Sequence, residues 1–187
     1  MSNRNDPRYK TPEEKKAYRQ EVSHFIRSNN VYIMTSRFNN ETYKENRDYV
    51  QTLNKVKCIY CCPDPIARSI PCDANMLVLE MNNEENRIMG IGKIKNNAKI
   101  QKFKVYNENN YNRYQYIGTQ HIDRMSMNEE EEELMKKFDQ WCFKGLGHMK
   151  RGQGIKSFPN ERLYEYSKEG NISQYLHKMF QKRQSEQ

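Results

Sequence analysis

The sequence has little of what builds a large hydrophobic core. Leu, Ile, Val and Phe account for 33 of the 187 residues. This share is under about 20%, and chains with so few of these residues are often disordered. The formal net charge of +8 is small for this length, however, and 13 Tyr and 10 Met add surface that can be buried. We therefore expect a single small domain over residues 11–182, with a disordered tail at 1–10 and a frayed tail at 183–187.

Long apolar runs are missing too. No stretch approaches the roughly 18 apolar residues that a membrane-spanning helix needs, so we expect no contact with a membrane. The first residues, MSNRNDPRYK, have no apolar centre, so we expect no secretory signal. The sequence therefore predicts an intracellular protein, in the cytoplasm or the nucleus.

The cysteines lack the spacing of a complete metal site. Cys58 and Cys61 form one C-x-x-C pair, but no second pair of cysteines or histidines follows at the spacing of a zinc site. Residues 57–62, KCIYCC, are apolar, and a free cysteine behaves as a small hydrophobic side chain. We therefore predict buried thiols without disulfides, and no metal or other cofactor.

Four helices are predicted, at 11–28, at 40–53, from Asn128 onwards, and at 171–182. The third follows a run of five glutamates (129–133), which could signal a metal site. Apolar residues at helical spacing come directly after the run, and acidic side chains favour the positive end of a helix. A helix start is therefore the preferred interpretation.

Most of the predicted strands lie between the second and third helices. Residues 75–81 and 87–95 form a hairpin around a polar turn. Gly90 and Gly92 alternate in its second strand, which lets a backbone, a ring or a ligand approach, or marks a bulge or bend. Further strands are expected at 31–36, 57–62, 99–106 and 112–122. The order predicts an α+β fold, with a curved mixed or antiparallel sheet or a small open barrel flanked by helices.

A glycine-rich segment follows the third helix. Residues 144–156 contain four glycines, four cations and no acid, although their order is neither that of a P-loop nor that of a dinucleotide-binding turn. Such a loop can bring backbone N–H groups and cations to a phosphate; a merely solvated basic loop is the alternative. The candidate phosphate contacts are Lys144, His148, Lys150, Arg151 and Lys156.

A second basic stretch contains no acid from residue 88 to 107. Its candidate contacts are Lys93, Lys95, Lys102 and Lys104, and tyrosines at 106, 111, 114 and 116 follow it. Cations bind backbone phosphates and aromatic rings stack on unpaired bases, although a solvated sheet face is again the alternative. For stacking we select Trp141, Tyr114 and Tyr116, and burial in the core is the competing role for Trp141.

Signals of catalysis are weak. His121 and Asp123 could form an acid–base pair, but a structural turn at Asp123–Arg124 is the simpler interpretation. His148, next to Lys150 and Arg151, could support cleavage of a phosphodiester by general acid–base action. No motif surrounds a nucleophile.

Two segments resemble the PUA-like superfamily, which includes the YTH, EVE and ASCH domains. VYIMTSRFNNETYKENRDYV (31–50) is similar to the first strand and helix of a YTH domain, and NMLVLEMNNEENRIMGIGKI (75–94) to its central hairpin. The resemblance implies RNA or modified bases bound between sheet and helix. Tryptophans cage a methylated adenine in YTH domains, whereas Trp141 lies downstream of the matching region, so tyrosines would have to form the cage. HMKRGQGI (148–155) also looks like segments of uncharacterised proteins of large DNA viruses.

Taken together, these patterns predict a PUA-like domain that binds nucleic acid, with RNA favoured over DNA, and does not catalyse a reaction. One alternative is an ASCH-like nuclease that uses His148. Another is a viral structural or interaction protein, in the host cell or the virion, whose basic charge meets an acidic partner. The oligomeric state is left open. Convergence of Trp141, His148 and the 88–95 strand on one pocket would favour base recognition.

Overall fold

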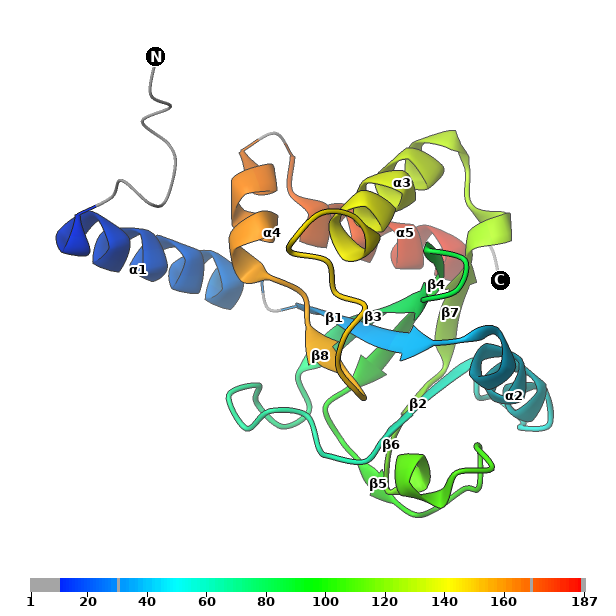
Figure 1. Ribbon diagram of the computed structural model, residues 1–187. Helices are drawn as coiled ribbons and strands as arrows, with labels where there is room; N and C mark the ends of the chain where they lie inside the picture. Colours follow the sequence, from blue (N-terminus) through cyan, green and yellow to red (C-terminus); the bar gives the residue numbers. More distant parts are fainter. Residues whose placement is uncertain (1–10, 30, 169, 186–187) are drawn as a thin grey trace.

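The computed structural model describes residues 11–29, 31–168 and 170–185. The tail expected at 1–10 lies outside this part of the chain. The fold is α+β, with two open sheets and helices packed around them (Figure 1). The α-helices are α1 (Pro12–Asn29), α2 (Asn40–Gln51), α3 (Glu129–Phe143), α4 (Asn160–Ser167) and α5 (Ile172–Ser185). Among the described residues, the 3₁₀ turn η2 (Asn109–Asn112) lies between β5 and β6, and the 3₁₀ turn η3 (Arg124–Ser126) lies between β7 and α3.

The larger sheet is mixed and has five strands in the order β7-β4-β3-β1-β8. Its first strand, β1 (Tyr32–Phe38), runs parallel to β3 (Asn75–Asn82), and the other pairs are antiparallel. The remaining members are β4 (Arg87–Lys95), β7 (Gln120–Asp123) and β8 (Lys156–Ser157). The expected mixed sheet and flanking helices are therefore present.

The smaller sheet is antiparallel and has the order β2-β6-β5. It consists of β2 (Cys58–Cys62), β6 (Tyr114–Gly118) and β5 (Lys99–Ile100). The sequence predicted its segments but not their separation from the larger sheet.

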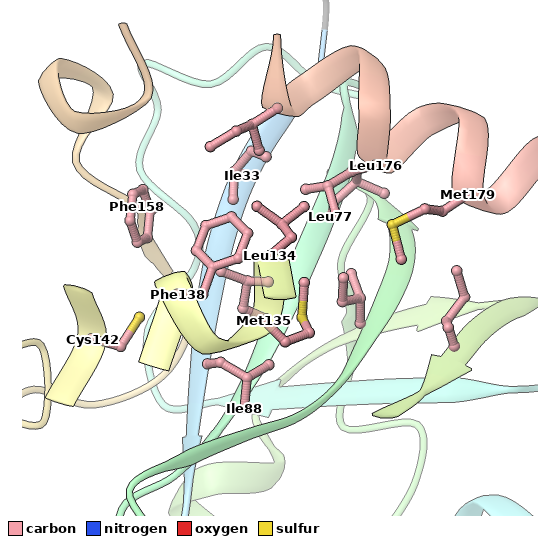
Figure 2. Packing of buried hydrophobic residues seen from close by; sticks show 14 of the residues in the cluster. Ile33, Leu77, Ile88, Leu134, Met135, Phe138, Cys142, Phe158, Leu176 and Met179 are labelled. Atoms are coloured by element: carbon pink, nitrogen blue, oxygen red, sulfur yellow. The ribbon is translucent and has the colours of Figure 1, made fainter. Parts of the chain in front are cut away.

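One face of the larger sheet is covered by helices. Leu77 and Leu79 on β3 belong to the same core cluster as Phe138 of α3 and Leu176 of α5, and Figure 2 shows these helices over the strands. The opposite face carries Met76 and Val78, which pack with β2 and α2. Because β3 is buried on both faces, its sequence is a nearly continuous apolar run rather than an alternating one.

Gly92 explains how the two sheets come together. A side chain there would overlap the hydroxyl of Tyr60 on β2 and would lie 2.7 Å from the Cys58 sulfur. The bare surface predicted at this glycine therefore admits an aromatic ring, one of the roles considered from the sequence.

The predicted hairpin at 75–95 is confirmed, with a register shift between Leu79 and Met81. The predicted strand at 99–106 is wrong beyond Ile100, and the strand at 112–122 is divided at Thr119 between the two sheets. The last helix is longer than the one predicted at 171–182, because α5 continues to Ser185. Arg183 on this last turn pairs with Glu131 at 2.6 Å.

Candidate functional site

The start of α2 forms one wall of a cavity. Asn39 caps the helix, since its side chain accepts a hydrogen bond from the Thr42 N–H at 2.7 Å and its own N–H donates to the Thr42 hydroxyl at 3.0 Å. This reciprocal capping fixes the turn between β1 and α2. Phe38 and Glu45 continue the same wall.

The glycine-rich loop forms the opposite wall. After α3 it crosses the end of β1 and then pairs with that strand as β8 (Figure 1). The Arg37 Nε donates to the Met149 carbonyl at 2.5 Å, and the Asn83 amide donates to the Lys150 carbonyl at 3.0 Å. Gly154 has a φ of +66°, and a Cβ there would lie 2.7 Å from the Cys62 Cβ. Glycine is therefore required for the loop to close against β2.

Between these walls lies a cavity of about 330 Å³, which is within the usual size range of ligand sites, about 300–1,000 Å³. Its remaining lining comes from the end of β1, from Asn83 after β3, from Cys61 and from the segment after β5. The lining residues are Ser36, Arg37, Phe38, Asn39, Thr42, Glu45, Cys61, Asn83, Tyr106, Glu108, Tyr111, Gly152, Gln153 and Gly154.

Two polar atoms of the lining residues are buried without a hydrogen-bond partner in the described part of the chain. They are Nη1 of Arg37 and Oδ1 of Asn83. Burial lowers the pKa of Arg37 from its ordinary value, which reflects the loss of water around the guanidinium. Unpartnered buried polar groups are uncommon and call for an explanation such as a ligand.

Two tyrosines form the aromatic part of the lining. Tyr106 is buried and its hydroxyl accepts a hydrogen bond from Asn46 at 3.0 Å. Burial raises its pKa well above the ordinary value, so the phenol stays neutral at pH 7. Tyr111 is half-buried and meets Tyr106 edge to face, with 6.4 Å between ring centroids. Its ring therefore has part of its surface left for a ligand.

The predicted phosphate contacts of the loop lie outside the cavity lining. Lys144, Arg151 and Lys156 are exposed, while His148 and Lys150 are half-buried. The Lys150 ammonium donates to the Asn86 side chain at 2.8 Å, and the buried Nδ1 of His148 has no partner among the described residues. The backbone of the loop, rather than its cations, lines the cavity.

The second set of cations is divided between elements. Lys93 and Lys95 lie on β4, whereas Lys102 and Lys104 follow β5 in a segment that is not a strand. Lys93 is half-buried and the other three are exposed. This second set does not line the cavity either.

The predicted stacking residues separate into different environments. Tyr116 is buried: it is 1% exposed, and its hydroxyl accepts a hydrogen bond from the Ile66 N–H at 2.9 Å. Tyr114 is half-buried, with the Arg113 guanidinium 5.7 Å from its ring centroid. Trp141 packs against the rings of Phe138, Phe158 and Tyr166, with centroids 5.4–5.9 Å away. It lines a separate hollow with Lys144 and Tyr18. The expected convergence of Trp141, His148 and the 88–95 strand on one pocket is therefore not seen.

His121 takes part in a buried polar network rather than an acid–base pair with Asp123. Its Nε2 lies 3.0 Å from the Glu80 carboxylate, which also accepts a hydrogen bond from the Tyr60 hydroxyl at 2.8 Å. Burial alone would raise the pKa of Glu80, but His121, Arg47 and Tyr60 together outweigh it and the pKa is lowered. The Glu80 side chain is fully buried and that of His121 is 6% exposed, so this network is closed to a substrate. Asp123 instead caps η3 by accepting from the Met125 N–H at 2.8 Å, and the expected structural turn is confirmed.

The cysteines are all free thiols, and four of them, Cys58, Cys61, Cys62 and Cys142, are buried as expected. Cys72 is exposed. Burial raises the pKa of Cys62 to about 11, so its thiol is protonated and unreactive at neutral pH. In the described part of the chain, no three His, Cys, Asp or Glu side chains gather as a metal ion would require.

Comparison with known proteins gives no relative: no protein-family model, curated protein or solved structure matches this chain. Within the described residues, none of the helices has the length and apolar character needed to cross a bilayer.

Sequence reasoning selected the glycine-rich segment that lines the cavity and noted Tyr106 and Tyr111 beside the second basic stretch. It missed Arg37, Asn83 and Glu108. Arg37 and Asn83 reach the same loop only because β1 and β3 are parallel neighbours whose ends lie together. A cation directly after one predicted strand, Arg37, and a pair of asparagines after the other, Asn82 and Asn83, were the signal that could have suggested them.

Proposed function

We propose that this protein binds single-stranded nucleic acid, RNA in preference to DNA, without catalysing a reaction. An unpaired base enters the cavity between α2 and the glycine-rich loop, and its ring stacks on Tyr111. The cations of the loop, Lys150 and Arg151, hold the flanking phosphates. The observation that carries the proposal is the cavity itself, which combines aromatic rings with polar side chains beside a cationic loop. Recognition of single strands depends on this combination.

A PUA-like relationship is part of the same proposal. The parallel β1 and β3, joined through α2 and β2, and the β3–β4 hairpin support it. An intracellular location is also proposed, which the free thiols support because oxidising compartments favour disulfides. The nuclease alternative has less support, because His148 does not line the cavity.

The proposal is tested with Tyr111→Leu, which keeps apolar volume but removes the aromatic plane. Binding of a fluorescent single-stranded RNA and the matching DNA is measured by anisotropy, together with the melting temperature of each variant. Loss of a stacked base weakens binding by about 1–3 kcal/mol, so Tyr111→Leu should lose affinity while its melting temperature changes little.

Trp141→Phe is the matched control, since it also alters one half-buried ring. Trp141 packs against three core rings, so its variant should melt earlier and bind RNA unchanged at a temperature where it is folded. The reverse result, with affinity lost only in Trp141→Phe, would move the site to the hollow beside Trp141. If neither RNA nor DNA binds wild type at low salt, the proposed function is wrong.

A further inference from the structure

The lining of the cavity carries more acid than base, although the whole chain is basic. The net charge of the chain is +8, yet Glu45 and Glu108 both line the cavity. Among the described residues of this lining, Arg37 has the only cationic side chain. Its Nε donates to the Met149 carbonyl and its Nη1 is buried, so the guanidinium is directed to the backbone of the loop. The cavity therefore presents two carboxylates to a ligand.

The two carboxylates belong to neighbouring parts of the lining. Asn107, the residue before Glu108, donates a hydrogen bond to Glu45 at 2.5 Å. Glu45 is half-buried and Glu108 is exposed, so a ligand can reach both side chains. Burial is the main cause of the raised pKa of Tyr106, and the charge of Glu45 contributes to it. The negative charge is therefore felt at an aromatic ring of the cavity.

Aromatic rings and carboxylates together favour a cation. The face of an aromatic ring attracts positive charge, and Tyr111 is half-buried, with part of its ring left for a ligand. A carboxylate attracts a cation and repels a phosphate. Phosphates of a bound strand would therefore stay outside the cavity, beside the cations of the loop, and the group that enters would gain from a positive charge.

The ordinary bases are neutral at neutral pH, but a base becomes a cation when a methyl group is added to a ring nitrogen such as N1 of adenine or N7 of guanine. We propose, as an extension of the proposed function on which it rests, that the cavity binds a base with a positively charged ring in preference to a neutral base. The charged ring stacks on Tyr111, with Glu45 and Glu108 beside it. This preference opposes the general attraction of a basic protein for a polyanion, because a cationic base removes one negative charge from the strand.

The experiment uses the full-length protein and a U-rich RNA of about 12 nucleotides with N1-methyladenine or N6-methyladenine at its centre. These two bases are isomers, and only the first is a cation at neutral pH. Wild type should bind the N1-methyladenine RNA more tightly by roughly 5- to 30-fold, as expected for a cation held against an aromatic ring away from water. N7-methylguanine and guanine form a second pair, in which the charged base should again bind more tightly.

Glu45→Gln with Glu108→Gln keeps the size of both side chains and should reduce the charged-to-neutral ratio to about one. Glu108→Gln alone changes only an exposed position and should reduce the ratio in part. Glu13→Gln with Glu85→Gln is the matched control, because these two exposed acids do not line the cavity, and it should keep the ratio. Removing acids can strengthen binding to every RNA alike, so the ratio rather than the affinity is the decisive quantity.

The outcomes separate the two proposals. If wild type binds charged and neutral bases equally, and every RNA binds with strong salt dependence, the charge preference is overturned while the proposed function stands. A preference that survives in Glu45→Gln with Glu108→Gln would overturn the role of the carboxylates.

If none of the RNAs binds at low salt, the proposed function itself fails. Calorimetry with free N1-methyladenosine and N6-methyladenosine then tests the cavity alone. Tighter binding of the charged nucleoside, lost in the double variant, would support the charge preference without RNA. Equal binding of the two nucleosides, or none, would overturn it as well.

Discussion

A single glycine, Gly92, lies where the Tyr60 ring reaches from the smaller sheet onto the larger one. The Tyr60 hydroxyl donates to Glu80 at 2.8 Å, and Glu80 meets His121 at 3.0 Å. A methyl group at Gly92 would overlap the hydroxyl and press on the Cys58 sulfur. One missing side chain therefore permits both the contact between the sheets and the buried network beneath them.

Gly92→Ala should destabilise the protein by about 1–3 kcal/mol, the usual effect of overpacking a core. Urea unfolding followed by tyrosine fluorescence measures the change. Gly170→Ala is the control, because a Cβ at that position meets no atom within 4 Å, and its effect should stay within about 0.5 kcal/mol. Equal unfolding midpoints for the two variants would contradict the packing shown around Tyr60.

At the scale of elements, α3 is fixed to the sheet and to α5 by buried charges. Arg124, whose side chain is 4% exposed, pairs with Glu132 and Asp139 at 2.7 Å each. Arg183 on α5 pairs with Glu131 at 2.6 Å. The glutamate run at the start of α3 thus combines helix capping, as predicted, with two ion pairs that join it to η3 and α5.

These pairs make stability depend on pH. The hydrogen bond from Arg183 lowers the pKa of Glu131, and that from Arg124 lowers the pKa of Glu132. A carboxylate with a depressed folded-state pKa stabilises the fold above its unfolded value, about 4.3. That contribution disappears as the pH falls through the lower, folded value. The free energy of unfolding should therefore become smaller as the pH is lowered below about 4.3.

Glu131→Gln with Glu132→Gln should weaken the fold at neutral pH and flatten this acid dependence. Urea unfolding at a series of pH values measures both effects. Glu129→Gln with Glu133→Gln, two exposed positions of the same helix, is the control with the same change in charge. A double variant whose pH profile overlays that of the wild type would show that these pairs contribute nothing.

Some helices and strands could be predicted from the sequence and others could not. Helix starts and the β3–β4 hairpin depend on neighbouring residues, such as Asn128 before its glutamates, and these predictions are confirmed. Polar and apolar residues alternate over 101–106 as they do in a strand. Backbone N–H groups of this segment, however, donate to side chains and not to a neighbouring strand. The Asn112 side chain accepts from the N–H groups of Val105 and Tyr106 at 2.9 and 3.0 Å, and Gln115 accepts from Phe103. Alternation reports burial of side chains, and it does not show where the backbone hydrogen bonds go.

For the cavity, sequence reasoning found the glycines because their composition is local. It missed Arg37 and Asn83 because they are 46 positions apart and approach the loop only through the β1–β3 pairing. It did not predict the burial of Tyr116, because strand alternation gives Tyr114 and Tyr116 the same face, whereas the packing of residue 66 covers one of them.

At the scale of the whole molecule, the net charge of +8 attracts any polyanion. Local contacts have to be separated from this general attraction. Lys150 and Arg151 lie on the loop beside the cavity, whereas Lys15 and Lys16 are exposed on α1, which projects away from the two sheets (Figure 1). The pair Lys150 and Arg151 carries the same charge as the pair Lys15 and Lys16, so the two pairs differ only in where they lie on the molecule.

Lys150→Ala with Arg151→Ala should therefore weaken RNA binding for all sequences alike. It should also flatten the plot of log affinity against log salt by about 0.7 for each phosphate that the loop no longer binds. Lys15→Ala with Lys16→Ala should lower affinity slightly and leave the slope nearly unchanged, because these residues lie on α1 and do not line the proposed site. Anisotropy titrations at four or more salt concentrations measure the slopes.

If both double variants change the slope equally, the loop makes no specific phosphate contact. In that case Lys102→Ala with Lys104→Ala is the next variant, because this pair precedes the tyrosines that line the other side of the cavity.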